Sequence, residues 1–233
     1  MTPLNRRTML KHAAAVASLA LVTACGGGGD AGSALNVGAD GVSAFDANTL
    51  GSVLDTYPMQ DVSATEAAAL RFMREEEMLA HAVYANSARL WPAQPIFGNI
   101  AASEATHAAA VKALLDRYAV ADPLATVPAG TLVSPDFLSL QATLVAASQV
   151  SAVGALTVGG QIEELDLSDL QQRTALTDNA DILLVYENLA RGSRNHLRAF
   201  VKALTALGAS YTPRYLSLAQ YQAIIDAPME TGR

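Results

Sequence analysis

Large apolar residues recur at spacings of three and four from Ser63 to about Ala227, and this helical period constrains the fold more than any other feature of the chain. No alternating strand pattern or hairpin signal interrupts it. Cap signals, among them the capping-box pattern at 63–66 and Gly208, divide the range into helices. The predicted helices run from 63 to about 89, from near 95 to 121, from 135 to 148, from 151 to about 170, from about 180 to 207, and from 217 to 227. The sequence therefore predicts an all-α four-helix bundle with short extra helices in the crossover and at the C-terminus.

Residues 1–25 have the composition of an export signal. An arginine pair and a lysine precede an apolar run that ends in small residues and Cys25. The run is about half of the roughly 20 residues that a membrane-spanning helix needs, so a permanent span is the weaker interpretation. The end of the run resembles a lipoprotein processing box, and the arginine pair resembles a twin-arginine signal. We therefore expect a lipid anchor at Cys25 that holds the protein in the cell envelope, facing the periplasm, with the outer membrane favoured by Gly26. A free or buried thiol is the alternative.

The rest of the chain divides into a tether and one domain. Residues 26–55 are rich in Gly, Ala and Ser, which bury too little surface to offset the entropy of ordering, so a flexible tether is predicted. Residues 56–228 have the size of one domain with a sizeable core. Cys25 is the single cysteine, which excludes an intrachain disulfide. Removal of the signal leaves 12 basic against 22 acidic side chains, which argues against nucleic acid as a partner.

Polar residues lie where an apolar bundle face is expected. Glu104 and His107 are three apart in the middle of the inner stripe of the second long helix, and Glu77 has a similar place on the first. Glu75 and Glu76 are predicted to be more exposed. Burial of a carboxylate and an imidazole costs several kcal/mol unless the two are paired or bound to metal. Metal binding is the favoured interpretation, and a buried Glu-His pair of structural value is the alternative.

The third and fourth long helices repeat the theme. Glu163 falls on the core stripe of the third helix with Asp166 three residues further on, and His196 falls on the inner face of the fourth. Each of the four helices thus offers an inward oxygen or nitrogen donor near its middle, as in bundles that bind a di-iron or di-manganese pair. Carboxylates bridge two divalent ions and neutral imidazoles complete the site. Iron is the expected metal, as two ions or one, with manganese as the alternative.

Five segments of the chain resemble a known family. They are Leu70 to Tyr84, Asn99 to His107, Ile162 to Asp166, Tyr186 to Leu189 and Arg191 to Phe200. Over roughly residues 57–225 the chain resembles the ferritin-like family named only as domain of unknown function 2202, which is related in fold to the rubrerythrins. The rubrerythrin pattern has a Glu on the first helix, Glu-x-x-His on the second, carboxylates on the third and Glu-x-x-His on the fourth. The resemblance implies a ligand set of Glu77, Glu104, His107, Glu163, Asp166 and His196.

One position departs from that pattern. The Glu expected three residues before His196 is Ser193 here, which removes a strong bridging oxygen. His81 is a candidate substitute ligand, although a solvated or core-edge His81 is the favoured interpretation. Arg194 and Arg198 offer another reading of the site, in which they neutralise the buried acids.

The favoured function is that of a di-iron oxidoreductase of the cell envelope that acts on O₂ or peroxide. Because the chain has no rubredoxin-type cysteine pairs, electrons would come from a separate partner. Two alternatives stay open: a non-catalytic metal-binding or storage lipoprotein, and a helical interaction module whose metal site has degenerated. A homodimer is compatible with each, and these residues do not identify the substrate or the redox partner.

Overall fold

The computed structural model describes residues 35–37, 43–45, 47–128 and 130–231, and the described part is mainly helical. Its helices are α1 (Ala47–Leu54), α2 (Ala64–Leu90), α3 (Ile96–Arg117), α4 (Pro135–Ser148), α5 (Ala152–Thr174), α6 (Ala180–Ala206) and α7 (Leu218–Asp226). All six helices predicted from Ser63 onward are present, which confirms the all-α bundle.

The caps that the sequence signals have the expected geometry. The Ser63 side chain accepts from the Glu66 backbone N–H while the Glu66 carboxylate accepts from the Ser63 backbone N–H, so α2 begins with a complete capping box. Pro135 is the first residue of α4 after the N-cap Ser134. Gly208 follows α6 with a φ of 71°, a left-handed conformation that favours glycine.

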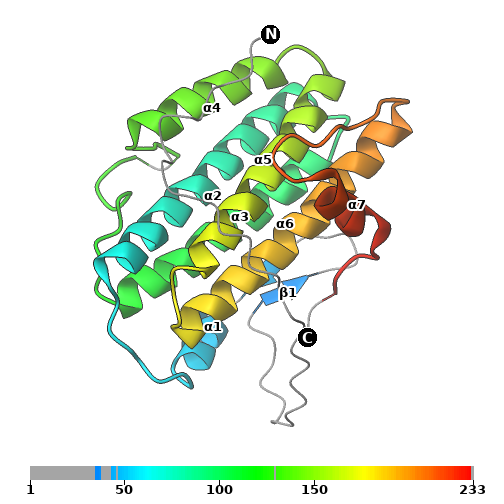
Figure 1. Ribbon diagram of the computed structural model, residues 1–233. Coiled ribbons are helices and arrows are strands. Elements are labelled where there is room, and N and C mark those ends of the chain that lie inside the picture. Colours follow the sequence, from blue (N-terminus) through cyan, green and yellow to red (C-terminus); the bar gives the residue numbers. More distant parts are fainter. Residues whose placement is uncertain (1–34, 38–42, 46, 129, 232–233) are drawn as a thin grey trace. The chain divides into compact units, whose positions relative to one another are not determined.

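Helices α2, α3, α5 and α6 form the bundle and run side by side along a common direction (Figure 1). Short connections join α2 to α3 and α5 to α6, while α3 also contacts α6 and α2 contacts α5. The connection from α3 to α5 is the long one, and it contains α4, which packs on the outside against α2 and α5. Helix α7 packs on α6. This is a four-helix bundle with one long crossover.

Two hydrophobic clusters fill the bundle, one toward each end. The buried members of the first cluster include Val83, Phe97, Leu156 and Phe200. Those of the second cluster include Leu70, Leu114, Leu170 and Val185. On α2, α3 and α6 the residues of the two clusters are separated in sequence by a short stretch near the middle that contains the polar residues of interest. On α5 the polar residues Glu163 and Asp166 lie among members of the first cluster, before Leu170 of the second.

The segment before α2 is also partly folded. Two three-residue strands, β1 (Leu35–Val37) and β2 (Ser43–Phe45), pair antiparallel, and α1 follows directly. The end of the predicted tether is thus helical, because Leu50 and Leu54, four residues apart, are buried in the second hydrophobic cluster. The predicted signal and Cys25 lie outside the described residues. In the described part of the chain no helix is long and apolar enough to cross a membrane.

Candidate metal centre

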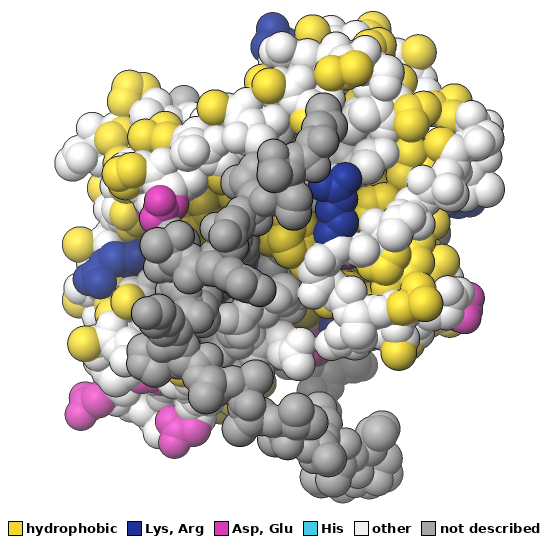
Figure 2. Space-filling view, turned by 45° about the horizontal axis from the view of Figure 1, so that its top comes forward, with side chains coloured by type: hydrophobic (Ala, Val, Ile, Leu, Met, Phe, Trp, Pro, Cys, Tyr) yellow, Lys and Arg dark blue, Asp and Glu magenta, His cyan; other side chains and the backbone are white. Residues whose placement is uncertain are grey.

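The structure brings the six predicted ligands together in the middle of the bundle. All six residues are buried, with at most 5% of their surface exposed. Helix α2 supplies one of them, α3 two, α5 two and α6 one: Glu77, Glu104, His107, Glu163, Asp166 and His196. Figure 2 agrees with this burial, since no histidine side chain among the described residues is visible on the face that it shows.

Glu104 is the centre of the cluster because each of its two oxygens faces a different imidazole. On one side, His107 Nδ1 lies 3.0 Å from Glu104 Oε2 and 3.5 Å from Glu77 Oε2. On the other side, His196 Nδ1 lies 2.8 Å from Glu104 Oε1 and 3.5 Å from Glu163 Oε2. Two groups of three potential ligand atoms result, each with two carboxylates and one imidazole, and each compact enough to hold one metal ion. They share Glu104.

The two imidazoles lie close together without bonding each other. The His107 and His196 rings are stacked, with centroids 5.5 Å apart and planes inclined by 25°. Each ring therefore presents its Nδ1 to its own pair of carboxylates. If each group held an ion, Glu104 would be a ligand in both.

Asp166, the sixth predicted ligand, belongs to neither of these two groups, and it contacts Ser193, the residue at which the sequence departs from the rubrerythrin pattern. The Ser193 hydroxyl donates a hydrogen bond to Asp166 Oδ2, and Asp166 Oδ1 has no hydrogen-bond partner among the described residues. The charges of Glu104, Glu163 and His107 all act on the Asp166 carboxyl group. A carboxylate from α5 thus occupies the neighbourhood in which the pattern has a Glu on α6.

Two further buried hydroxyls hold the cluster in place. Tyr84 donates from its phenol oxygen to Glu163 Oε1 at 2.6 Å and to the Gly159 carbonyl at 3.2 Å. Ser103 Oγ is 3.0 Å from His196 Nε2, the ring nitrogen that faces away from Glu104. A partner on the second ring nitrogen fixes the orientation of an imidazole that binds metal.

Burial and crowding shift the pKa values of the cluster strongly. Burial and the neighbouring Asp166 carboxylate raise the pKa of Glu77 well above its ordinary value. Burial raises the pKa of Asp166 to about 8, although the hydrogen bond from Ser193 opposes the change. For Glu104 burial acts in the same direction, but the imidazoles of His196 and His107 outweigh it and lower the pKa. The cluster without cations therefore retains protons, which a divalent ion would displace.

The same crowding acts on the imidazoles. Burial favours the neutral form of His196, yet Glu104 and Glu163 raise its pKa to about 9. For His107 burial is again opposed by Glu104 and Glu77, and the pKa is raised well above 6.5. A site that draws protons onto its imidazoles is short of positive charge.

Several buried atoms of the cluster have no hydrogen bond within the described part of the chain. They include Glu77 Oε1, Glu104 Oε1, Asp166 Oδ1, His107 Nε2 and His196 Nδ1. Glu104 Oε1 and His196 Nδ1 are only 2.8 Å apart, but they are not aligned for a hydrogen bond. Unsatisfied buried polar atoms cost about 1–3 kcal/mol each, so their convergence favours a ligand that is shared between them.

The prediction that Glu75 and Glu76 are more exposed was wrong, because α4 and α5 cover α2 on sides that a single inner stripe ignores. Glu75 Oε1 accepts from the backbone N–H groups of Val133 and Ser134, just before α4. Burial and the Asp169 carboxyl group raise the pKa of Glu76 well above its ordinary value. The burial of Asp169 was not predicted either, although this residue continues the i, i+3 series that begins with Glu163 and Asp166.

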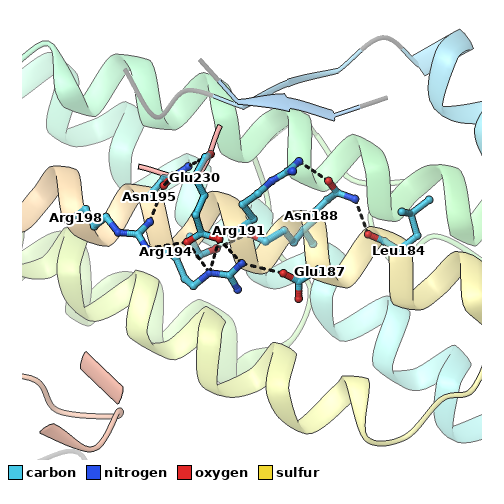
Figure 3. Close-up of polar contacts among 10 residues, drawn as sticks. Leu184, Glu187, Asn188, Arg191, Arg194, Asn195, Arg198 and Glu230 are labelled. Carbon is cyan, nitrogen blue, oxygen red and sulfur yellow. Dashed lines mark hydrogen bonds and ion pairs between the residues drawn. The ribbon is translucent and has the colours of Figure 1, made fainter. Parts of the chain in front are cut away.

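The remaining candidates from the sequence lie apart from the cluster. His81 is half-buried, and its Nδ1 is hydrogen-bonded to the Ala101 carbonyl at 2.8 Å. Arg194 and Arg198 both contact Glu230 near the C-terminus, and Arg194 also pairs with Glu187 (Figure 3). These arginines therefore neutralise other carboxylates than those of the cluster.

Comparison with known proteins agrees with the fold. The sequence profile of an uncharacterised protein domain, DUF2202, matches residues 66–228. The uncharacterised protein MJ0754 of Methanocaldococcus jannaschii is 46% identical over 179 residues, which are 77% of this chain and 96% of that protein. The crystal structure of the hypothetical protein MJ0754 from Methanococcus jannaschii DSM 2661 superposes with a TM-score of 0.72 at 47% identity, over 74% of this chain and 98% of that one.

Proposed function

The chain belongs to the DUF2202 family of uncharacterised proteins, and from that premise we propose that its bundle binds a pair of divalent metal ions with the Glu104 carboxylate between them. The observation that carries the proposal is the pair of ligand groups that share this residue. A hydrogen-bonded structural pair would need one imidazole for one carboxylate, whereas here a single carboxylate faces two imidazoles.

The charges of the cluster fit two ions. Four carboxylates, those of Glu77, Glu104, Glu163 and Asp166, carry four negative charges when ionised, and two divalent cations balance them with both imidazoles neutral. In the described part of the chain no lysine or arginine forms an ion pair with these four groups. Buried charges are found in proteins when they are paired or bound to metal, so two cations are a better match than one.

The chain's own residues would divide the work. Glu77 and His107 would hold one ion and Glu163 and His196 the other, both with Glu104. Asp166 would supply a further carboxylate, which interacts electrostatically with Glu104, Glu163 and His107. We propose that Asp166 thereby replaces the Glu that is absent at position 193. Tyr84 would keep Glu163 in its orientation through the hydrogen bond to Oε1.

Iron is the metal that we propose, with manganese as the alternative, because carboxylate and imidazole donors in a bundle suit both. A bound iron pair supplies two-electron redox chemistry toward O₂ or peroxide, and we propose an oxidoreductase of that kind with a separate electron donor. We further propose that the mature protein is exported and held in the cell envelope through a lipid on Cys25, as its N-terminal residues suggest. Metal storage without catalysis is the second candidate, and the absence of a Glu at position 193 favours it.

Metal content of the purified full chain is the first test. The chain is incubated anaerobically with excess ferrous or manganous ion, freed of unbound metal on a desalting column, and measured by elemental mass spectrometry. We expect about two ions per chain. Glu104→Gln should lose both, because both groups use this carboxylate. Glu187→Gln is the matched control, since this exposed glutamate on α6 forms its one ion pair among the described residues with Arg194.

Each outcome decides between the candidates. Two ions in the wild type and the control, and none in Glu104→Gln with unchanged helical circular dichroism, support the metal pair. A folded wild-type chain that binds neither metal overturns it and favours the helical interaction module. Two ions without turnover of peroxide or O₂ in the presence of an artificial reductant favour storage.

A further inference from the structure

A pocket of about 970 Å³ opens beside the metal centre, between the start of α3, the second half of α6 and the segment that contains α7 and the residues after it. Apolar side chains from all three elements form most of its wall, among them Ile96, Ala203, Ile225 and Met229. Its volume is within the range of sites that bind small organic molecules. A wall of this composition favours a ligand with an apolar body.

The pocket reaches the metal centre at His196, which belongs to its lining. His196 is completely buried, and its Nδ1 faces Glu104. His196 therefore lies behind the surface of the pocket wall, and it is also a candidate ligand of the cluster. A molecule in the pocket would lie next to the wall that covers this residue.

The charges of the pocket select the sign of its ligand. No aspartate or glutamate is part of its described lining. Arg198 is committed elsewhere, because its guanidinium donates to Glu230, Asn195 and the Ile224 carbonyl (Figure 3). Lys202 is exposed, lies in the lining and has no ion pair with any described residue. An unpaired cation beside an apolar wall is complementary to an anionic head group on an apolar chain.

We propose that this pocket binds a small anionic amphiphile, such as a free fatty-acid anion, with its head group at Lys202 and its chain directed toward His196. The proposed metal pair matters to this inference in one respect, because it determines what lies next to the bound ligand. Binding itself depends on the pocket, and it can be measured with or without metal.

The test measures binding of decanoate to the full chain by isothermal titration calorimetry in detergent-free buffer. Ala203→Trp places a large ring on the pocket wall and should weaken binding at least tenfold. Ala146→Trp, on an exposed position of α4, is the matched control and should bind like the wild type. Lys202→Glu should weaken decanoate binding by up to about 25-fold, because it replaces an attraction worth up to about fivefold by a repulsion of similar size. Neutral decanol should respond to Ala203→Trp but not to Lys202→Glu.

A second readout places the ligand. In the chelator-treated chain labelled with ¹⁵N-histidine, decanoate should shift the imidazole signals of His196 more than those of His81. Binding that leaves the His196 signals unmoved overturns the proposed position, and equal binding by Ala203→Trp and the wild type overturns the pocket. Binding to anionic phospholipid vesicles without binding to decanoate overturns the proposed ligand class.

The two proposals fail separately. A chain that takes up no metal but binds decanoate, with the block by Ala203→Trp, refutes the metal pair and supports the pocket. A chain that holds two ions but gives no heat with decanoate refutes the pocket and supports the metal pair.

Discussion

Without bound metal, the free energy of unfolding should decrease as the pH rises. The size of this decrease can be worked out for Asp166. Its pKa is 3.8 ordinarily and about 8 in the buried cluster. Between these values the folded chain binds one proton more than the unfolded chain at this residue. A carboxyl group with a raised folded pKa therefore lowers the free energy of unfolding by about 1.4 kcal/mol per pH unit, or about 2.7 kcal/mol from pH 5 to pH 7.

His196 acts in the same direction over a higher range. Its pKa rises from 6.5 to about 9 on folding, so the stability that it contributes is complete below 6.5 and is lost as the pH approaches 9. Glu77, whose pKa is also raised, adds to the slope of the acids. Without metal, stability should thus fall from pH 5 to pH 9, and more steeply above pH 6.5.

The assay is urea unfolding followed by circular dichroism at several pH values, with chelator present. Asp166→Asn has no proton to lose there, so its stability relative to the wild type should rise by about 1.4 kcal/mol per pH unit between pH 5 and pH 7. The same measurement with bound metal should show no such fall, because cations replace the protons. Parallel pH profiles of the wild type and Asp166→Asn without metal would refute the proposed protonation of the cluster.

Three other substitutions have defined outcomes. Gly159→Ala should destabilise the fold by about 1–3 kcal/mol in urea, because the new Cβ would lie 2.5 Å from the Phe200 ring, whereas Gly98→Ala on α3 has open space and should not; equal stability of the two variants would contradict the close packing. Glu75→Ala should cost about 1–3 kcal/mol, since it leaves two backbone donors before α4 without their acceptor, while two ions per chain are kept; loss of metal would place Glu75 in the centre. Cys25→Ser should move the protein from the membrane fraction to the soluble fraction on cell fractionation, and an unchanged distribution would count against the lipid anchor.

The sequence predicted the helices well because local signals define them. Apolar spacing and cap residues depend on a few neighbouring positions, and both are visible in a single chain. The exposure of Glu75 and Glu76 was predicted wrongly for a different reason. A stripe describes one inner face, while α2 is covered by α3, α4 and α5 together. Which outer faces are covered depends on the path of the crossover, which periodicity does not determine.

The candidate metal centre shows the same division between local and long-range information. Residues at helical spacing, such as Glu104 and His107, could be grouped from the sequence because both lie on one stripe. The hydrogen bond between Ser193 and Asp166 could not, because it joins two different helices at residues 27 positions apart in the chain. The pattern on α6 alone indicates a missing ligand, while the packed bundle shows a carboxylate from α5 in the same neighbourhood. Metal ligation by these residues stays a prediction until it is measured.

Because Glu104 belongs to both groups of potential ligands, we expect the binding of the two ions to be coupled. Glu104 would be held in one rotamer once either group is occupied, and its other oxygen would then face the second group. Chains with a single ion should then be scarce, and filling should rise steeply over a narrow range of free metal, with a Hill coefficient above one and at most two. Both sites of such a protein would be empty below a threshold concentration of free metal and filled above it.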